Sequence, residues 1–194
     1  MNILSLLRKD EEILIRYETY KSSENIFYEG DECLYVAVVL EGSVKISSYS
    51  RQGNETVFNT IRKDQMFGNN LLFSSSPFYK GDVTAMENVK IALIKKEDLI
   101  DILKNNDEFL LEYLKIQSNF GKELNSKIKL LSNTSAKDRL LYYLEDNGGT
   151  VHYLSITSLA RELNLERETL SRTISSLTKK GIISHTDKTL KVRP

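Results

Sequence analysis

The stretch NLERETLSRTISSL, residues Asn164–Leu177, is charged where it begins and apolar at regular intervals afterwards. Leu170, Ile174 and Leu177 recur in steps of four and three residues, which is the spacing of one helix face. The preceding segment SITSLARELN has a similar periodicity, and Asn164-Leu165 is typical of a tight turn. Two helices joined by a short turn predict a helix-turn-helix.

The outward side of the second predicted helix carries polar and charged side chains near its N-terminal end. In a helix-turn-helix, these positions contact base edges in the major groove. Arginine is the common bidentate partner of guanine, and glutamate can accept a hydrogen bond from cytosine N4. Phosphates would repel an acidic side chain, so a glutamate between two arginines favours base reading. The predicted base-reading residues are Arg167, Glu168, Ser171 and Arg172.

A simpler interpretation makes the same strip a solvated helix face. Glu168 and Arg172 would then form a surface ion pair worth about 0.2–0.5 kcal/mol, and the spacing alone leaves both interpretations open. The charge distribution gives a weak indication of an anionic partner. Residues 132–194 hold ten Lys and Arg against seven Asp and Glu, whereas residues 1–131 hold seventeen against twenty. Weaker predictions, for phosphate contacts, are Thr157, Ser158, Lys179, Lys188 and Lys191.

The residues around this motif complete a small domain. AKDRLLYYLEDN is an amphipathic helix that ends at Gly148-Gly149, and Ser155 or Thr157 is the expected N-cap of the next helix. After Gly181, IISHTDKTLKV predicts a two-stranded ribbon that turns at Asp187-Lys188. Residues 132–194 are therefore predicted to form a winged helix-turn-helix domain.

The first half of the chain has the pattern of short strands separated by turns. Glycines at positions 30, 42, 53 and 68 mark turns that require positive φ. Strands at this spacing predict an antiparallel sandwich or barrel within residues 1–106. The predicted strands are Cys33–Leu40, Val44–Tyr49, Thr56–Ile61 and Val89–Ile94.

The period becomes helical after Lys96, with a long helix predicted over residues 107–131. One seam alternates steps of four and three, as in a coiled-coil partner surface, and predicts a dimer interface. A second stripe, from Phe109 to Phe120, lies on a neighbouring face and is expected to pack on the β-domain. The alternative is that both stripes are intramolecular core. The seam consists of Leu110, Leu114, Gln117, Gly121, Leu124, Ile128 and Leu131.

Composition narrows the classes of function. The chain has 194 residues, is 40% hydrophobic and carries a single cysteine, Cys33, which disfavours a cysteine-ligated iron–sulfur cluster and fits a reducing cytoplasm. Residues 1–131 contain no histidine, which disfavours haem or a metal enzyme built on the barrel. MNILSLLRKDEE lacks the features of a signal peptide, and no apolar run of about 18 residues predicts a membrane span.

Three segments in order give the chain a resemblance to the CRP/FNR family of bacterial transcription regulators. LERETLSRTISSLTKKGII resembles the recognition helix of that family, with the patterns R-E-T-x-x-R and E-x-x-S-R. IFYEGDECLYVAVVLEGSVKISSYSRQGNETVFNTIRKDQMFG resembles its cyclic-nucleotide-binding-like β-roll, and the long helix occupies the place where the family dimerises. The resemblance implies an α+β fold, a homodimer on palindromic double-stranded DNA with a TGA-type half-site, RNA polymerase as a further partner, and a small-molecule effector.

The resemblance is weakest where the family binds its ligands. Where cyclic-nucleotide binders have a glutamate for the ribose, this chain has Asn69, and where they have an Arg-Ser pair it has Tyr79 and Lys80. The N-terminal cysteine cluster of the oxygen-sensing branch is absent. Cyclic AMP, haem and an iron–sulfur cluster are therefore all disfavoured. From position alone, Asn69, Asn70, Tyr79 and Lys80 are candidates to line the pocket of an unidentified effector.

The expected protein is a cytoplasmic, dimeric DNA-binding regulator without a membrane partner. Its α+β architecture comprises a β-roll sensor (1–106), a dimerisation helix (107–131) and a winged helix-turn-helix domain (132–194). One rival is a ligand-sensing module with vestigial DNA binding, which the intact Arg167, Glu168 and Arg172 argue against. The other is an enzyme, for which the sequence offers no catalytic constellation.

Overall fold

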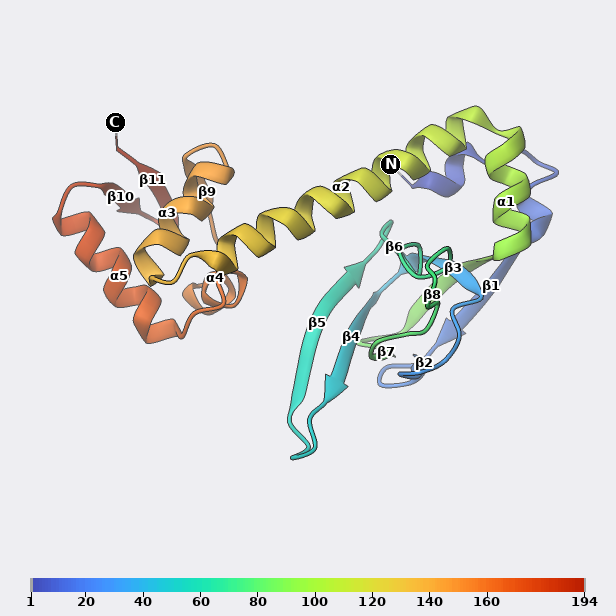
Figure 1. The fold of residues 1–194 in the computed structure, drawn as a ribbon, viewed down its shortest axis with the longest axis horizontal. Coiled ribbons are helices and arrows are strands. Elements are labelled where there is room, and N and C mark those ends of the chain that lie inside the picture. The colour runs from blue at the N-terminus through green and yellow to red at the C-terminus, as the bar shows by residue number, and fades with distance from the viewer. Residues whose placement is uncertain (1, 194) are drawn as a thin grey trace. The chain divides into compact units, whose positions relative to one another are not determined.

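The computed structural model describes residues 2–193 and has an α+β architecture (Figure 1). The chain forms two compact units, Met1–Ser118 and Asn119–Pro194. The division lies inside helix α2 (Asp107–Ser132), so this helix is shared between the units instead of forming a segment of its own. None of the helices within residues 2–193 is long and apolar enough to cross a membrane.

The first unit contains two four-stranded antiparallel sheets, with strand orders β1-β8-β3-β6 and β2-β7-β4-β5 (Figure 1). Strands β3 and β8 are buried along most of their length, which explains their nearly continuous apolar sequence. The predicted antiparallel β-roll is confirmed. The strands are β1 (Ile15–Tyr20), β2 (Asn25–Phe27), β3 (Tyr35–Glu41), β4 (Ser43–Tyr49), β5 (Glu55–Arg62), β6 (Met66–Phe67), β7 (Asp82–Ala85) and β8 (Val89–Lys95).

Two of the predicted turn glycines show why no other residue fits. Gly42 has φ +77° and joins β3 to β4, and a Cβ there would lie 2.5 Å from the carbonyl oxygen of Asn88. Gly68 follows β6 with φ +79°, and a Cβ there would lie 2.7 Å from the carbonyl oxygen of Tyr35. Both turns therefore combine a left-handed backbone with the close approach of another backbone segment.

Helices and 3₁₀ turns complete the first unit. The turns η1 (Ile3–Leu6) and η2 (Glu12–Leu14) precede β1, and α1 (Lys96–Asn105) follows β8. Between α1 and α2, the Asn106 side chain accepts a hydrogen bond from the Phe109 amide at 3.1 Å and donates one to Glu11 at 2.8 Å. Asn106 therefore begins α2 and fixes it to the N-terminal segment.

The second unit has the predicted winged helix-turn-helix layout. The two-residue turn at Asp187-Lys188 has φ values of +42° and +59°, as a tight hairpin between twisted strands requires. The short sheet has the order β10-β11-β9 and is antiparallel. The elements after α2 are α3 (Ala136–Asp146), β9 (Thr150–His152), α4 (Ile156–Glu162), α5 (Arg167–Lys179), β10 (Ile183–Thr186) and β11 (Thr189–Val192).

Candidate nucleic-acid interface

Helix α5 has one buried face and one exposed face. Leu170, Ile174 and Leu177 are at most 3% exposed and belong to the core of the second unit. The predicted base-reading residues are all exposed on the other side and line an open cleft of ≈ 470 Å³. The structure therefore brings together all four of them, namely Arg167, Glu168, Ser171 and Arg172.

The exposed strip of α5 carries hydrogen-bonding groups that can contact base edges in a DNA major groove. Within residues 2–193, the ion pairs do not include one between Glu168 and Arg172, so these groups remain available to an external partner. Both arginines lie in the first two turns of α5, beside the helix N-terminus at Glu166. Two bidentate donors with one acceptor between them match the mixed donor and acceptor pattern of a major groove.

Helix α4 begins with a capping box that involves one of the predicted phosphate contacts. The Ser155 hydroxyl accepts a hydrogen bond from the Ser158 amide at 3.0 Å, and the Ser158 hydroxyl accepts one from the Ser155 amide at 3.1 Å. Ser155, and not Thr157, is therefore the N-cap. The Ser158 hydroxyl already serves this box, whereas Thr157 is exposed and unengaged by it. This geometry favours Thr157 over Ser158 as a phosphate contact.

The predicted turn between the two helices is fixed by backbone bonds and by one side chain that the sequence did not single out. Asn164 has φ +50°, and the Leu165 amide donates to the Ala160 carbonyl at 2.9 Å. Arg139 on α3 donates from Nη1 to the Asn164 carbonyl at 2.9 Å. This contact joins residues that lie 25 positions apart in the sequence, so no local sequence pattern predicts it.

Three of the predicted phosphate contacts are exposed lysines around the wing. Lys179 ends α5, Lys188 lies at the hairpin turn and Lys191 lies on β11. The β10–β11 hairpin forms the wing. Tyr153, which follows β9, donates its amide hydrogen to the Lys188 carbonyl at 3.0 Å and so holds the hairpin turn beside the end of β9. A stable hairpin with lysines at its tip and edge can contact phosphates that flank a reading helix.

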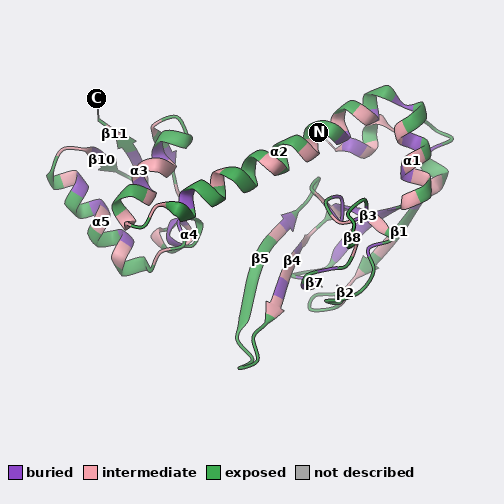
Figure 2. Ribbon diagram, in the orientation of Figure 1, coloured by how far each residue is buried: buried purple, intermediate pink, exposed green. Residues whose placement is uncertain are grey.

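The predicted dimer seam is largely uncovered within the chain. Leu114, Leu124, Ile128 and Leu131 are between 40% and 59% exposed, and a Cβ at Gly121 would meet no atom within 4 Å. Figure 2 shows that α2 is mostly exposed along its second half. A row of exposed leucine and isoleucine side chains is typical of an interface, since such patches are rare on monomers.

Gln117 departs from its predicted place in the seam. Its side-chain oxygen accepts a hydrogen bond from Asn69 at 2.6 Å, and its nitrogen donates to the Asn69 carbonyl at 2.8 Å. It therefore lies toward the β-roll of its own chain, because an amide gains more from these polar partners than from an apolar seam. On the neighbouring stripe, Phe109 and Tyr113 are buried as predicted, but Phe120 is 37% exposed.

The four candidate effector residues differ in their burial and in their partners within the chain. Tyr79 is 3% exposed, stacks on Phe27 with ring centroids 4.7 Å apart, and belongs to the core. Its hydroxyl lies 3.6 Å from the Cys33 sulfur, and burial raises the pKa of both groups. Asn69 is buried against α2, whereas Asn70 and Lys80 are exposed. Two of the four candidates, Tyr79 and Asn69, are therefore engaged within the chain, and an effector pocket at these residues stays a prediction.

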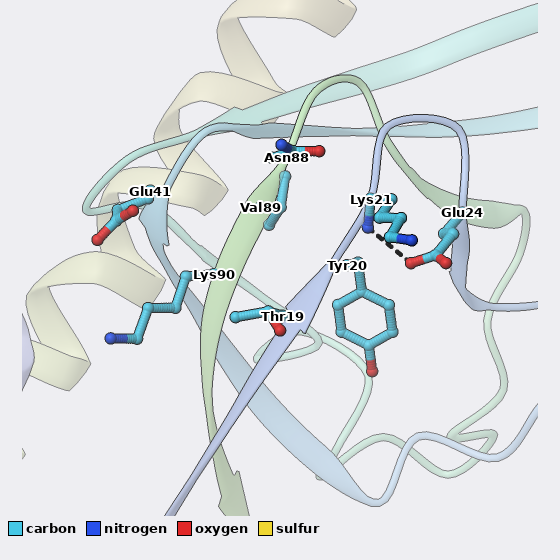
Figure 3. A pocket seen from close by; sticks show the side chains of 8 residues that line it. All are labelled: Thr19, Tyr20, Lys21, Glu24, Glu41, Asn88, Val89 and Lys90. Atoms are coloured by element: carbon cyan, nitrogen blue, oxygen red, sulfur yellow. Dashed lines mark hydrogen bonds between the residues drawn. The ribbon is translucent and has the colours of Figure 1, made fainter.

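A different part of the β-roll does have an open cleft, of ≈ 420 Å³ (Figure 3). The cleft lies between the C-terminal ends of β1 and β3 and the N-terminal end of β8. Its charges are mixed, and the Lys21 amide already donates to the Glu24 carboxylate at 2.6 Å. Within residues 2–193, no group of three or more His, Cys, Asp or Glu side chains is arranged to hold a metal ion. The lining residues of the cleft are Thr19, Tyr20, Lys21, Glu24, Glu41, Asn88, Val89 and Lys90.

Comparison with known proteins matches both units to known domains. The family profile described as "Cyclic nucleotide-binding domain" matches residues 17–106, and the one described as "Crp-like helix-turn-helix domain" matches residues 138–193. The second match contains the whole exposed strip of α5. Together the two matches span most of the chain, in the order that the fold shows.

Relatives extend the similarity over nearly the full length. The chain is 25% identical to the "Anaerobic regulatory protein" of Bacillus subtilis, over 95% of this chain and 87% of that protein. It is 22% identical to the "Cyclic AMP receptor protein" of Thermus thermophilus, over 90% of this chain and 82% of that protein. A solved structure of CooA from Carboxydothermus hydrogenoformans shares the fold, with a TM-score of 0.68, 18% identity, and coverage of 100% of this chain and 91% of that one. The chain therefore belongs to the CRP/FNR family of DNA-binding transcription regulators.

Proposed function

We propose that this regulator binds an inverted-repeat site as a homodimer, with one α5 helix in each of two successive major grooves about 34 Å apart. The observation that carries the proposal is the exposed strip of α5, whose opposite side is locked into the core. Arg167 and Arg172 read guanine edges, Glu168 reads a cytosine, and Ser171 assists. Uncovered apolar side chains on α2, such as Leu124 and Ile128, form the dimer contact.

Selection from a pool of randomised duplexes tests the base-reading part. The wild-type protein is expected to recover an inverted repeat with a TGA-type core. Arg172→Ala should lose preference at one guanine position by about 1–3 kcal/mol while it keeps the other positions. Lys137→Ala, which removes an exposed positive charge from α3, is the matched control. An equal loss of affinity for Arg172→Ala on every sequence would make Arg172 a phosphate contact instead.

Cyclic AMP is not the effector in this proposal. Tyr79 and Lys80 stand where cyclic-nucleotide binders carry an Arg-Ser pair, and the Tyr79 ring is packed into the core. Lys80 could offer one charge but not the bidentate geometry of an arginine. Cyclic AMP at millimolar concentration should therefore leave the melting temperature unchanged, whereas a ligand at 100 times its Kd would stabilise the protein by about 2.7 kcal/mol. Haem and an iron–sulfur cluster are likewise not proposed as cofactors.

The remaining parts of the proposal concern the setting of the protein. It acts in the cytoplasm, has no catalytic activity of its own, contacts RNA polymerase at its promoters and responds to an unidentified small molecule. Support comes from the family of transcription regulators to which its domains belong. Native mass spectrometry of the freshly purified chain would report both the dimer and any retained ligand. A monomer at micromolar concentration would overturn the dimer.

A further inference from the structure

The guanidinium group of Arg139 spans the two parts of the second unit that decide where α5 lies. Its Nε donates to the Asn133 carbonyl at 2.8 Å, and its Nη1 donates to the Asn164 carbonyl at 2.9 Å. Asn133 directly follows the end of α2, and Asn164 is the turn residue of the helix-turn-helix. One side chain therefore connects the end of the seam helix to the base-reading motif.

The first of these two attachment points is fixed to α2. The Asn133 amide donates to the Leu130 carbonyl at 3.2 Å, and its side-chain nitrogen donates to the Lys129 carbonyl at 2.9 Å. Leu130 is 5% exposed and packs in the core of the second unit. Lys129 also lies over the Tyr142 ring, 5.1 Å from its centroid. The Asn133 carbonyl therefore moves with the last turn of α2.

The second attachment point is equally constrained. The Asn164 amide donates to the Arg161 carbonyl at 3.1 Å, and its φ of +50° leaves its own carbonyl pointing out of the helical pattern. Arg139 supplies this exposed carbonyl with a donor from within the chain. Arginine supplies two donors in a rigid planar fork, and lysine supplies one compact charge on a flexible stem. Only an arginine at this position can hold both carbonyls at a fixed separation.

We propose that Arg139 is a positioning residue that sets the distance and angle of α5 relative to the end of α2, and thereby the half-site spacing that a dimer accepts. The inference rests on the proposed dimeric base reading. Arg139 itself does not belong to the exposed reading strip of α5. Its loss should therefore alter tolerance to spacing while the base preference within each half-site stays the same.

The test uses the full chain and three duplexes that carry the inverted repeat selected by the wild-type protein, with the original spacing and with one base pair added or removed. One base pair rotates the half-sites by about 35° relative to each other, so the wild type should bind the altered duplexes at least about tenfold more weakly. Arg139→Gln and Arg139→Lys should bind the original duplex about tenfold more weakly and discriminate spacing less than about threefold. Lys137→Gln, on the same helix, should behave as wild type.

The outcomes separate this inference from the proposed function. A wild-type protein that selects no inverted repeat would defeat the proposed function. A wild type that selects one, with both Arg139 variants retaining its steep spacing preference, would overturn the positioning role alone. Repeating the selection with Arg139→Lys supplies the second readout, since a changed base preference inside the half-site would also overturn it. Unfolding of each variant is followed in parallel so that Arg139→Lys replaces Arg139→Gln if the latter is poorly folded.

Discussion

The side-chain amide of Gln117 on α2 is bonded to Asn69 in the loop after β6 through two hydrogen bonds, of 2.6 and 2.8 Å. The Tyr113 hydroxyl joins them, 3.1 Å from the Gln117 nitrogen and 3.4 Å from the Asn69 carbonyl. The resemblance to the CRP/FNR family places Asn69 where its cyclic-nucleotide binders are expected to carry a ribose-binding glutamate. These hydrogen bonds hold the loop after β6 against α2 within the same chain.

Removal of the Asn69 side chain should destabilise the β-roll. Asn69→Ala leaves the Gln117 oxygen without its donor in a half-buried place, at an expected cost of about 1–3 kcal/mol. The buried Cys33 thiol provides the measurement, because a thiol reagent labels it only after the roll opens. The urea midpoint for labelling should fall for Asn69→Ala. Asn70→Ala, at an exposed neighbour, should change stability by less than about 0.5 kcal/mol. Equal midpoints for the two variants would contradict the role of the amide pair.

The seam on α2 should decide the dimer. Leu124 is 50% exposed in the single chain, and Leu124→Glu would bury a carboxylate in an apolar interface. The dimer should weaken by more than about 2 kcal/mol, as measured by sedimentation equilibrium. Lys122→Glu lies off the seam on the same exposed stretch of helix and makes a larger change in charge, yet it should leave the dimer intact. If both variants dissociate equally, net charge and not the seam controls assembly.

The sequence predicted the parts of this fold that have a strong period or a special turn. Gly42 is predicted because positive φ restricts the residue type, and the Asp187-Lys188 turn because it separates two β-rich segments. Strands β6 and β7, of two and four residues, are too short for a period to be read. The heptad spacing predicts Gln117 on the seam. Its partner Asn69 is 48 residues away and leaves no local signal.

In the candidate site too, the local sequence pattern predicts some features, whereas others depend on contacts between residues far apart in the chain. The helical period predicts the exposed strip of α5, because burial of the apolar face turns the opposite face toward solvent. Tyr79 was expected near an effector because its position aligns with a ligand-binding pair. The structure instead stacks it on Phe27, which only the packing of two sheets could reveal. No sequence pattern predicts the role of Arg139, because its acceptors are the backbone carbonyls of Asn133 and Asn164, which any residue could supply.

Alkaline unfolding should report on Tyr113. Burial raises the pKa of its phenol from 10.0 to about 12, so the native state favours the neutral form. The stability that this preference contributes is complete below pH 10 and is lost as the pH rises through about 12. In Tyr113→Phe this loss is absent, so the stability difference between wild type and variant should shrink across that window. Urea unfolding at stepped pH measures it. A difference that stays constant would show that the Tyr113 phenol does not ionise with unfolding.

The wing lysines should contribute affinity without specificity. Lys188 is exposed at the hairpin turn, where it can meet a phosphate. Lys188→Ala should weaken binding to all duplexes alike and reduce the slope of log K against log salt by about one. Lys63→Ala removes an exposed lysine from the β-roll and serves as the control, with no expected change in slope. Loss of preference at a single base position in Lys188→Ala would contradict a pure phosphate contact.

Glu168 provides the sharpest contrast with the lysines, because it is an acid on a surface that meets a polyanion. Glu168→Ala should bind random DNA more tightly, since a repulsion of phosphates is removed. It should also lose about 1–3 kcal/mol of discrimination at the base pair where the wild type selects cytosine. Competition assays with the selected and random duplexes measure both effects at fixed salt. Glu145→Ala, which removes an exposed carboxylate from α3, should change neither quantity. If Glu168→Ala raised affinity for both duplexes by the same factor, Glu168 would be a solvated acid at the helix N-terminus and not a reader of bases.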